Sequence, residues 1–289
     1  MMGGIIVISA KGKRMFFFVA LFCLAAMPVL SINIDSINPR ALALGGGAIA
    51  LTGMGLGTDN PASLAQTNSA LSFYYNNFYG FQGYEIKGGN FTVQTKLGTL
   101  GFVYDSEGIS LFEERMGSDY ESLWEEKKLA FGYAATMRKK LNFGLSIMQA
   151  NKNVYSDYED NVLMKKTNLL MNLGLQLNGE RFGIGCILKN LGGDIEPAFG
   201  LGLRFGKPNN LVAILDLLQG KDILGAKQII ASGGLEAWVR DNFALRISLD
   251  KVGMVSVGLG ASSGRIKVDY AYQIHPVGNT HYFATSYLF

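Results

Sequence analysis

From residue 70 onward, apolar side chains recur at every second position, with small or polar residues between them. Between residues 265 and 275 one face is wholly apolar: Ile266, Val268, Tyr270, Tyr272 and Ile274. Segments 242–250 and 128–138 alternate in the same way. A repeat of two residues is typical of a β-strand, whose successive side chains point to opposite faces. The pattern therefore predicts an all-β chain.

The residues on the second face of these strands indicate whether lipid or water surrounds the fold. It mixes charged residues with glycine, and the sequence offers no helices to cover the apolar faces. Lipid outside a closed barrel satisfies both faces, whereas a soluble all-β fold is the alternative. Beyond residue 31 there is no run of about 18 uncharged apolar residues, which excludes a helical membrane protein. We expect a transmembrane antiparallel β-barrel.

The spacing of the connections gives the strand count. Short turns are expected at 96–98, 138–140, 178–180, 207–209, 240–242 and 262–264. Longer connections are expected between them at 80–84, 111–123, 151–165, 190–196, 218–226, 250–253 and 276–280. Alternation of short and long connections is typical of bacterial barrels. Thirteen connections join about fourteen strands, although 109–116 could be either an added hairpin or a strand extension.

The first 31 residues resemble a signal peptide. Lys11, Lys13 and Arg14 precede the apolar stretch 15–30, the order of a leader, and an N-terminal membrane anchor is the alternative. Cys23 lies in this leader, so the mature chain keeps only Cys186 and forms no internal disulfide. We divide the chain into a signal peptide (1–31), an N-terminal plug segment (32–69) and the barrel (70–289).

The final strand indicates the membrane to which the chain is delivered. Phe283, Tyr287 and Phe289 share one of its faces, and the chain ends on an aromatic residue. Terminal strands of this kind carry the signal read by the barrel-assembly machinery. We therefore expect the cell outer membrane, with its lipid and that machinery as partners.

Residues 32–69 lack the length and phase of membrane strands. Asn60 can cap a short helix that starts at Pro61, where the missing N–H costs nothing. Glycines of the barrel fall on its inward phase, where a wall without side chains lets another backbone approach closely: Gly132, Gly144, Gly174, Gly183, Gly185, Gly202, Gly234 and Gly258. They favour a segment tucked into the pore, and relief of wall curvature is the alternative reading.

Inward charges are the candidate lumen residues. Those selected as a substrate-binding or lumen set are Arg246, Arg265, Lys267, Asp269, Arg240 and Glu236. Further inward charges are Lys128, Arg138, Lys189, Arg204 and Asp250. Their basic bias could attract a carboxylate headgroup, with Arg246 and Arg265 as the chosen pair. Alternatively, opposite charges on neighbouring strands pair and stabilise the wall.

Other chemistry finds little support. His275 and His281 flank the last connection without cysteines or organised carboxylates, so no metal is expected. No serine, histidine and acid fall together, so the chain is not expected to be an enzyme, and no cofactor is implied. The net charge is only +3 and the basic residues are scattered, which excludes nucleic acid as a partner.

Three stretches carry a family resemblance. Residues 38–48 read NPRALALGGGA and residues 59–65 read DNPASLA, and the chain ends with VGNTH before an aromatic-terminated strand. These resemble the start and end of FadL-superfamily barrels, most closely the PorV/PorQ-like branch. On this resemblance the plug residues are Arg40, Gly45, Gly46, Gly47, Asn60 and Pro61. Where relatives often carry an acidic pair, this chain has 52–55, TGMG, which puts a gating role of that pair in doubt.

The resemblance implies a fourteen-stranded barrel closed by an N-terminal hatch. In the FadL branch such barrels transport small hydrophobic molecules such as fatty acids. In the PorV branch they do not transport, and they serve as accessories in protein secretion or surface assembly. The expected partner is thus a hydrophobic small molecule or a secretion-system protein, and the sequence leaves both open.

Overall fold

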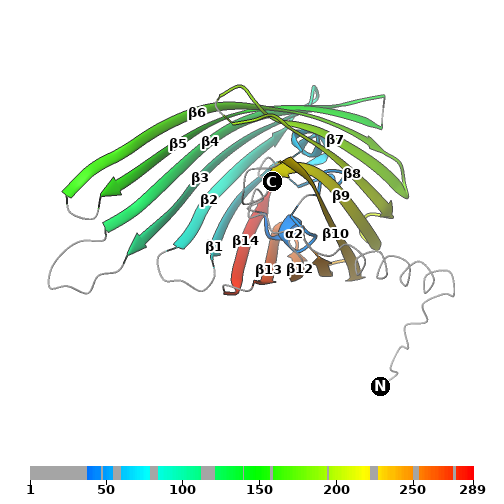
Figure 1. Ribbon diagram of the computed structural model, residues 1–289. Coiled ribbons are helices and arrows are strands. Elements are labelled where there is room, and N and C mark those ends of the chain that lie inside the picture. The colour runs from blue at the N-terminus through cyan, green and yellow to red at the C-terminus, as the bar shows by residue number, and fades with distance from the viewer. Residues whose placement is uncertain are drawn as a thin grey trace, which may run out of the picture.

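The chain folds into a closed antiparallel barrel of fourteen strands (Figure 1). The computed structural model describes residues 38–46, 48–54, 60–78, 84–111, 121–138, 140–156, 159–193, 195–221, 227–249, 254–275 and 278–289. The strands are β1 (Ala70–Asn77), β2 (Tyr84–Gln94), β3 (Thr99–Leu111), β4 (Glu121–Met137), β5 (Leu141–Ser156), β6 (Glu159–Asn178), β7 (Phe182–Leu191), β8 (Ala198–Gly206), β9 (Leu211–Lys221), β10 (Lys227–Arg240), β11 (Phe243–Leu249), β12 (Val255–Ser263), β13 (Ile266–Ile274) and β14 (Thr280–Leu288). The all-β class and the strand count are confirmed.

Each strand pairs with its sequence neighbours, and the last closes onto the first. Ala70 of β1 lies opposite Leu288 of β14, and Asn77 lies opposite His281. Both ends of the barrel chain therefore lie at the end of the barrel that carries the short turns, called here the turn end. The other end is the loop end.

One expected connection is wrong. Residues 151–165 were expected to form a loop, but β5 runs to Ser156 and β6 begins at Glu159. The polar residues there mimic a loop in the sequence, yet cross-strand pairs such as Asn151–Thr167 and Lys152–Lys166 keep them in the sheet. Strand β3 likewise extends to Leu111, which favours the strand extension over an added hairpin; residues 112–120 lie outside the described residues.

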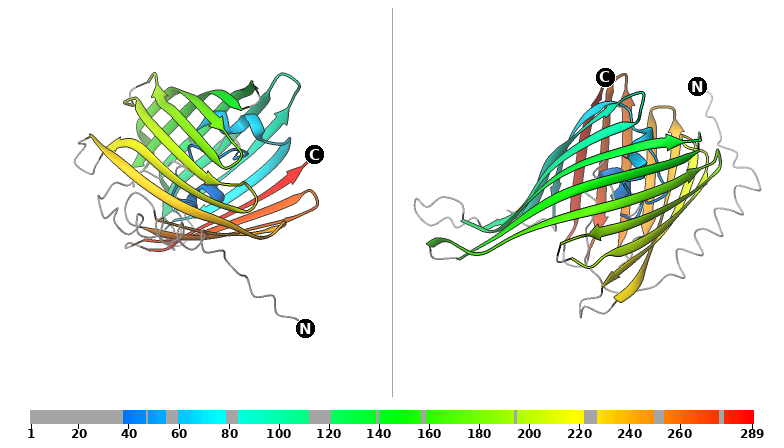
Figure 2. Two further views of the ribbon diagram at one scale, coloured as in Figure 1. Left: turned by 90° about the vertical axis from the view of Figure 1, so that its right-hand side faces the viewer. Right: turned by 90° about the horizontal axis from the view of Figure 1, so that it is seen from above.

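Strands β3 to β6 are longer than every other strand of the wall except β10, which has 14 residues. They have 13, 17, 16 and 20 residues, whereas about 9–11 residues cross a membrane. Their loop ends extend beyond the neighbouring strands as a projecting sheet, visible in Figure 1 and in the right view of Figure 2. On its outer face the apolar side chains stop at Leu129, Ile147 and Leu169, and polar residues follow toward the loop end.

The outside of the wall is apolar. Large hydrophobic side chains on the outward phase of nearly every strand are exposed, among them Phe73, Phe102, Phe131, Ile147, Leu175, Leu217, Ile247, Leu259 and Phe283. A continuous apolar surface of this extent needs lipid around it, so the barrel spans a membrane with its strands. Within the described residues, no helix is long and apolar enough to cross a membrane.

Inside the wall lies the N-terminal segment, defined as residues 38–46, 48–54 and 60–69. It contains a short helix, α2 (Pro39–Leu42), and a 3₁₀-helix, η1 (Pro61–Gln66). Helix α2 contacts β12, β13 and β14, whereas η1 contacts β3 to β6, so the segment lies against opposite parts of the wall (Figure 2). Residues 1–37, which hold the expected signal peptide, lie outside the described residues.

The inward glycines let this segment approach the wall. A Cβ added to Gly144 or Gly174 would overlap atoms of residues 60–62, and one added to Gly185 or Gly202 would lie against Ile49 and Ala50. At Gly234 an added Cβ would lie 2.7 Å from the Cα of Leu44. Gly258 similarly faces Ala43, whereas Gly183 faces the side chain of Arg204 instead. Six of the predicted glycines thus serve close backbone approach.

Candidate functional site

An arginine of helix α2 is bound to the wall by a bidentate ion pair. Arg40 donates from Nε and Nη2 to the two carboxylate oxygens of Glu236 on β10, at 2.8 and 2.7 Å. Asn38 places this arginine, because its side chain caps α2 by accepting from the Arg40 backbone N–H at 2.9 Å. Burial lowers the pKa of Arg40, but the Glu236 carboxylate outweighs that effect and raises it above its ordinary value. Arg40 therefore stays charged.

The ion pair continues from strand to strand along the wall. We call the linked residues Arg40, Glu236, Arg246, Asp269 and Lys267 the chain of charges. Arg246 on β11 donates to Glu236 at 2.8 Å and to Asp269 on β13 at 2.7 Å. Lys267 lies 3.3 Å from the other oxygen of Asp269. Trp238 adds an indole N–H bond to Glu236 at 3.1 Å.

The intervening strand β12 leaves room for this chain. Gly258 lies opposite Arg246 in the register, and Gly260 lies opposite Asp269. A Cβ on Gly260 would overlap the Arg246 guanidinium and lie 2.9 Å from the Asp269 carboxylate. Glycine at these positions lets one arginine span from β10 to β13.

The chain of charges is buried and nearly balanced. The side chains of Glu236 and Arg246 are fully buried, and three cations face two anions, which leaves one positive charge. A buried pair adds little net stability because desolvation offsets attraction, but removing one partner costs about 3–5 kcal/mol. The arrangement therefore makes the position of α2 depend strongly on Glu236.

The η1 end is attached without charges. The amide nitrogen of Asn60 donates to the Ile49 carbonyl at 2.7 Å, and its side-chain oxygen caps η1 by accepting from the Ala62 N–H at 3.0 Å. Gln176 of β6 reaches inward and donates to the carbonyls of Ile49 and Leu51 at 2.8 and 2.7 Å. The expected cap at Asn60 and the helix start at Pro61 are confirmed.

Between the two helices the segment packs through apolar side chains. Ala41, Leu44, Ala48, Leu51 and Met54 form a buried cluster with Val212 and Ile214 of β9. Gly45 and Gly46 turn the chain after α2 with φ of 97° and 83°, which favours glycine. Gly47 lies outside the described residues.

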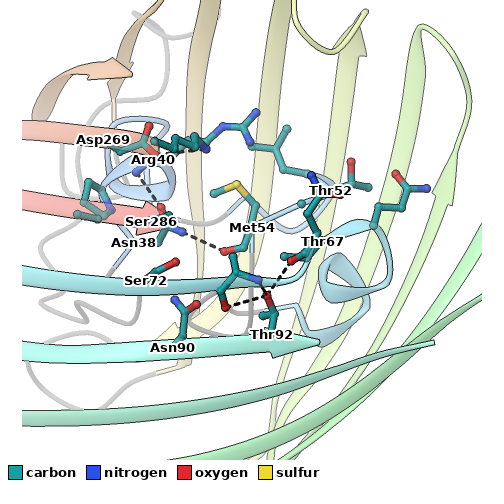
Figure 3. A pocket seen from close by; sticks show the side chains of 18 of the residues that line it. Asn38, Arg40, Thr52, Met54, Thr67, Ser72, Asn90, Thr92, Asp269 and Ser286 are labelled. Atoms are coloured by element: carbon teal, nitrogen blue, oxygen red, sulfur yellow. Dashed lines mark hydrogen bonds and ion pairs between the residues drawn. The ribbon is translucent and has the colours of Figure 1, made fainter. Parts of the chain in front are cut away.

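A cavity of about 380 Å³ lies between the N-terminal segment and the turn end of the wall (Figure 3). Its lining includes Asn38, Arg40, Thr52, Met54, Thr67, Ser72, Asn90, Thr92, Arg204, Lys267, Asp269 and Ser286. Arg204 is buried there and donates to the carbonyls of Gly206 and Gly179, both at 2.8 Å. The cavity has a mixed polar and apolar lining and more basic than acidic groups.

The residues that the sequence selects for the lumen fall into two groups in the structure. Glu236, Arg246, Lys267 and Asp269 join in the chain of charges. Arg240 and Arg265 are exposed at turns instead, and Arg265 donates to the Tyr287 hydroxyl at 3.4 Å. Arg246 and Arg265, the pair chosen for anion contact, are therefore not brought together. Arg246 is instead engaged by Glu236 and Asp269 on either side.

The remaining predicted residues lie elsewhere on the wall. Phe283, Tyr287 and Phe289 are exposed on the outward face of the last strand and its end. Lys128 pairs with Glu107 at 3.3 Å, Lys189 is buried, Arg138 lies in a turn, and Asp250 is outside the described residues. His281 contacts the Tyr270 hydroxyl at 2.8 Å. Within the described residues, no cluster of three or more potential metal ligands forms.

Sequence reasoning missed three contributors: the Asn38 cap of helix α2, Gln176 and Trp238. The pair Asn38–Pro39 repeats the pair Asn60–Pro61, and both asparagines cap the helices that follow. That repetition could have predicted helix α2. Gln176 and Trp238 belong to no motif, because an amide or indole on a strand becomes informative only once its facing backbone or carboxylate is known.

Comparisons with known proteins show the fold. No protein-family model matches the chain, and no curated protein sequence matches it. Among solved structures, it is similar to the P. putida toluene transporter TodX, with a TM-score of 0.64 at 12% identity over 89% of this chain and 99% of that one. The monoaromatic hydrocarbon channel CymD gives 0.65 at 12% identity over 90% and 99%. A FadL homologue of Pseudomonas aeruginosa gives 0.57 at 10% identity over 90% and 99%. The chain shares the FadL-type barrel fold.

Proposed function

We propose that the chain is an outer-membrane transport barrel for small hydrophobic molecules, with the N-terminal segment as its plug. The observation that carries this proposal is the bidentate pair between Arg40 and Glu236. It binds an element inside the barrel to the wall through a charged contact that a single substitution can remove. A purely structural filling would need no buried charges, since apolar packing of similar volume is at least as stable.

The path for the solute follows from where the segment is attached. Helix α2 lies against β12 to β14 and next to the cavity at the turn end. Movement of α2 away from Glu236 would join this cavity to the apolar side chains packed on the opposite side of α2, which include Phe78 and Tyr282. A signal peptide at 1–31, delivery by the assembly machinery through Phe283, Tyr287 and Phe289, and placement in the outer membrane complete the proposal.

The fold of the neighbours supports a hydrophobic solute. TodX is a toluene transporter and CymD is a monoaromatic hydrocarbon channel. We extend to this chain only the solute class of small hydrophobic molecules, of which fatty acids are one example. The apolar lining contributed by Leu51, Met54 and Val212 suits such a solute.

The experiment compares the refolded mature chain in liposomes with a chain that lacks residues 32–60. Transport predicts that the intact barrel takes up a labelled hydrophobic probe while it conducts few ions, and that the deletion raises ion conductance. If the intact barrel admits neither ions nor probe and the deletion only opens a hole, transport is rejected.

The second candidate is a PorV/PorQ-like accessory in protein secretion or surface assembly. The projecting sheet of β3 to β6 favours it, since 16 and 20 residues in β5 and β6 exceed what a membrane requires. A bound protein partner that depends on this sheet, together with a closed pore, would support the accessory function.

A further inference from the structure

On the loop-end side of α2 lies a second apolar cluster with a polar side chain at its centre. Leu42 and Ala43 of the N-terminal segment pack there with Tyr74, Phe78, Ile86, Ala271 and Tyr282 of the wall. The ring of Phe78 stacks on Tyr84 with centroids 4.8 Å apart and meets Tyr282 edge-on at 5.6 Å. We call this group the aromatic cluster.

Asn76 lies in the middle of the aromatic cluster. On β1 it shares the inward phase with Tyr74 and Phe78, and in the register it lies opposite Tyr282 and Ile86. All four of those neighbours belong to the cluster. Asn76 is fully buried, and within the described residues neither its amide nitrogen nor its amide oxygen has a hydrogen-bond partner.

The neighbouring hydroxyls do not satisfy this amide. Tyr282 donates its hydroxyl to the Gln273 side chain at 3.1 Å, and Tyr74 donates to the Tyr104 carbonyl at 3.4 Å. A buried polar group without a partner costs about 1–3 kcal/mol, and such groups in folded proteins call for a specific explanation. Within the described part of the chain, no side chain or backbone group bonds this amide.

We infer that Asn76 recognises the oxygen of a neutral, oxygenated small apolar molecule, such as a phenol or an aliphatic alcohol. The inference rests on the proposed function and narrows its solute class. The amide both donates and accepts, which matches a hydroxyl group, and the surrounding rings suit an apolar body. Leu42 and Ala43 occupy the place of that body until α2 moves.

Charged headgroups fit this position poorly. Asp105 brings a carboxylate to the cluster's edge: its Oδ1 and the Tyr74 hydroxyl both lie 2.8 Å from a Cβ built on Gly88. This acidic side chain offers no positive counterion to an anionic ligand. A cation would have to be buried among apolar rings, which is costly. A neutral oxygen is the remaining match.

The test measures binding of two matched probes, 4-ethylphenol and ethylbenzene, to the refolded mature chain by equilibrium dialysis in one detergent. The variant Asn76→Leu keeps the volume and removes the amide. Its affinity for 4-ethylphenol should fall about three- to tenfold, the loss of a neutral hydrogen bond, while ethylbenzene binding stays unchanged. Partition into micelles cancels because every variant is measured in the same detergent.

The matched control is Asn142→Leu. Asn142 is also a fully buried inward asparagine whose amide nitrogen has no partner among the described residues, but it lies on β5 and accepts from Thr136 at 2.9 Å. Its substitution should leave the discrimination between the two probes intact. Both variants should retain the folded barrel on heat-modifiability gels.

Each outcome separates the two proposals. If Asn76→Leu leaves 4-ethylphenol binding unchanged, or weakens both probes equally, the role of Asn76 is overturned while hydrophobic binding stands. If neither probe binds the wild-type barrel, the transport proposal fails and the role of Asn76 falls with it.

Discussion

The two ends of the N-terminal segment are attached to the same wall by opposite means. At the α2 end, Arg40 binds Glu236 through two charge-assisted hydrogen bonds. At the η1 end, Asn60 and Gln176 make neutral bonds to the backbone, and Gly144 and Gly174 bring the wall against η1. One end depends on a charge and the other on shape.

This difference suggests which end can move. Contacts with η1 are spread over β3, β4, β5 and β6, so no single contact releases η1. The α2 end has one carboxylate that serves two arginines. We therefore treat α2 as the releasable end and η1 as the fixed end of the proposed plug.

The largest effect is expected from Glu236→Gln. The change leaves Arg40 and Arg246 facing each other without their shared counterion, and raises the formal charge of the chain of charges from one to two. Unpaired buried charges cost about 3–5 kcal/mol. We expect release of α2, with a lower urea midpoint of the barrel and higher ion conductance in planar bilayers.

The control for that variant is Glu107→Gln. Glu107 also pairs with a wall lysine, Lys128 at 3.3 Å, but this pair does not involve the N-terminal segment. It should leave conductance unchanged. Equal conductance of the two variants would contradict the special role of Glu236.

A smaller effect is expected from Gly174→Ala at the η1 end. The added Cβ would overlap the Asn60 side-chain oxygen and lie 2.9 Å from the Ala62 nitrogen. Overpacking of this kind costs about 1–3 kcal/mol. Thermal unfolding followed by gel mobility measures it. The matched change is Gly183→Ala. The three atoms nearest its added Cβ all belong to the Arg204 side chain, at 3.0 Å or more, so this change should cost less.

The sequence predicts the barrel wall better than it predicts the candidate site. The period of two along residues such as 266–274 fixes the strand class, because membrane and lumen demand opposite polarities on alternate positions. Segment 151–165 escaped prediction because its polar residues lie beyond the lipid, where alternation is no longer required. The chain of charges escaped because Arg40 and Glu236 are 196 residues apart, and only the register of β10 to β13 brings Glu236, Arg246 and Asp269 together.

Loss of the η1 cap should have a modest effect. Asn60→Ala removes the acceptor for the Ala62 N–H and the donor to Ile49. The loss of an N-cap costs about 0.5–2 kcal/mol. We expect a small drop in unfolding midpoint with no rise in conductance. An open pore in this variant would show that η1 is also a releasable end.

The smallest effect is expected from Lys267→Met. Lys267 lies at the end of the chain of charges, 3.3 Å from Asp269, and its side chain is 25% exposed. Pairs that water reaches contribute about 0–1 kcal/mol. The variant should match the wild type in urea titration. A loss as large as that of Glu236→Gln would mean that the whole chain of charges, rather than Glu236, holds α2.

The most direct test of the two-ended attachment is cysteine accessibility at two fully buried alanines, Ala41 in α2 and Ala62 in η1. Each would be changed to cysteine in a mature chain carrying Cys186→Ala, with and without Glu236→Gln, and its rate of maleimide labelling measured in the folded barrel. Our account predicts that Glu236→Gln greatly accelerates labelling at position 41 and leaves position 62 protected. Equal acceleration at both positions, or at neither, would contradict it.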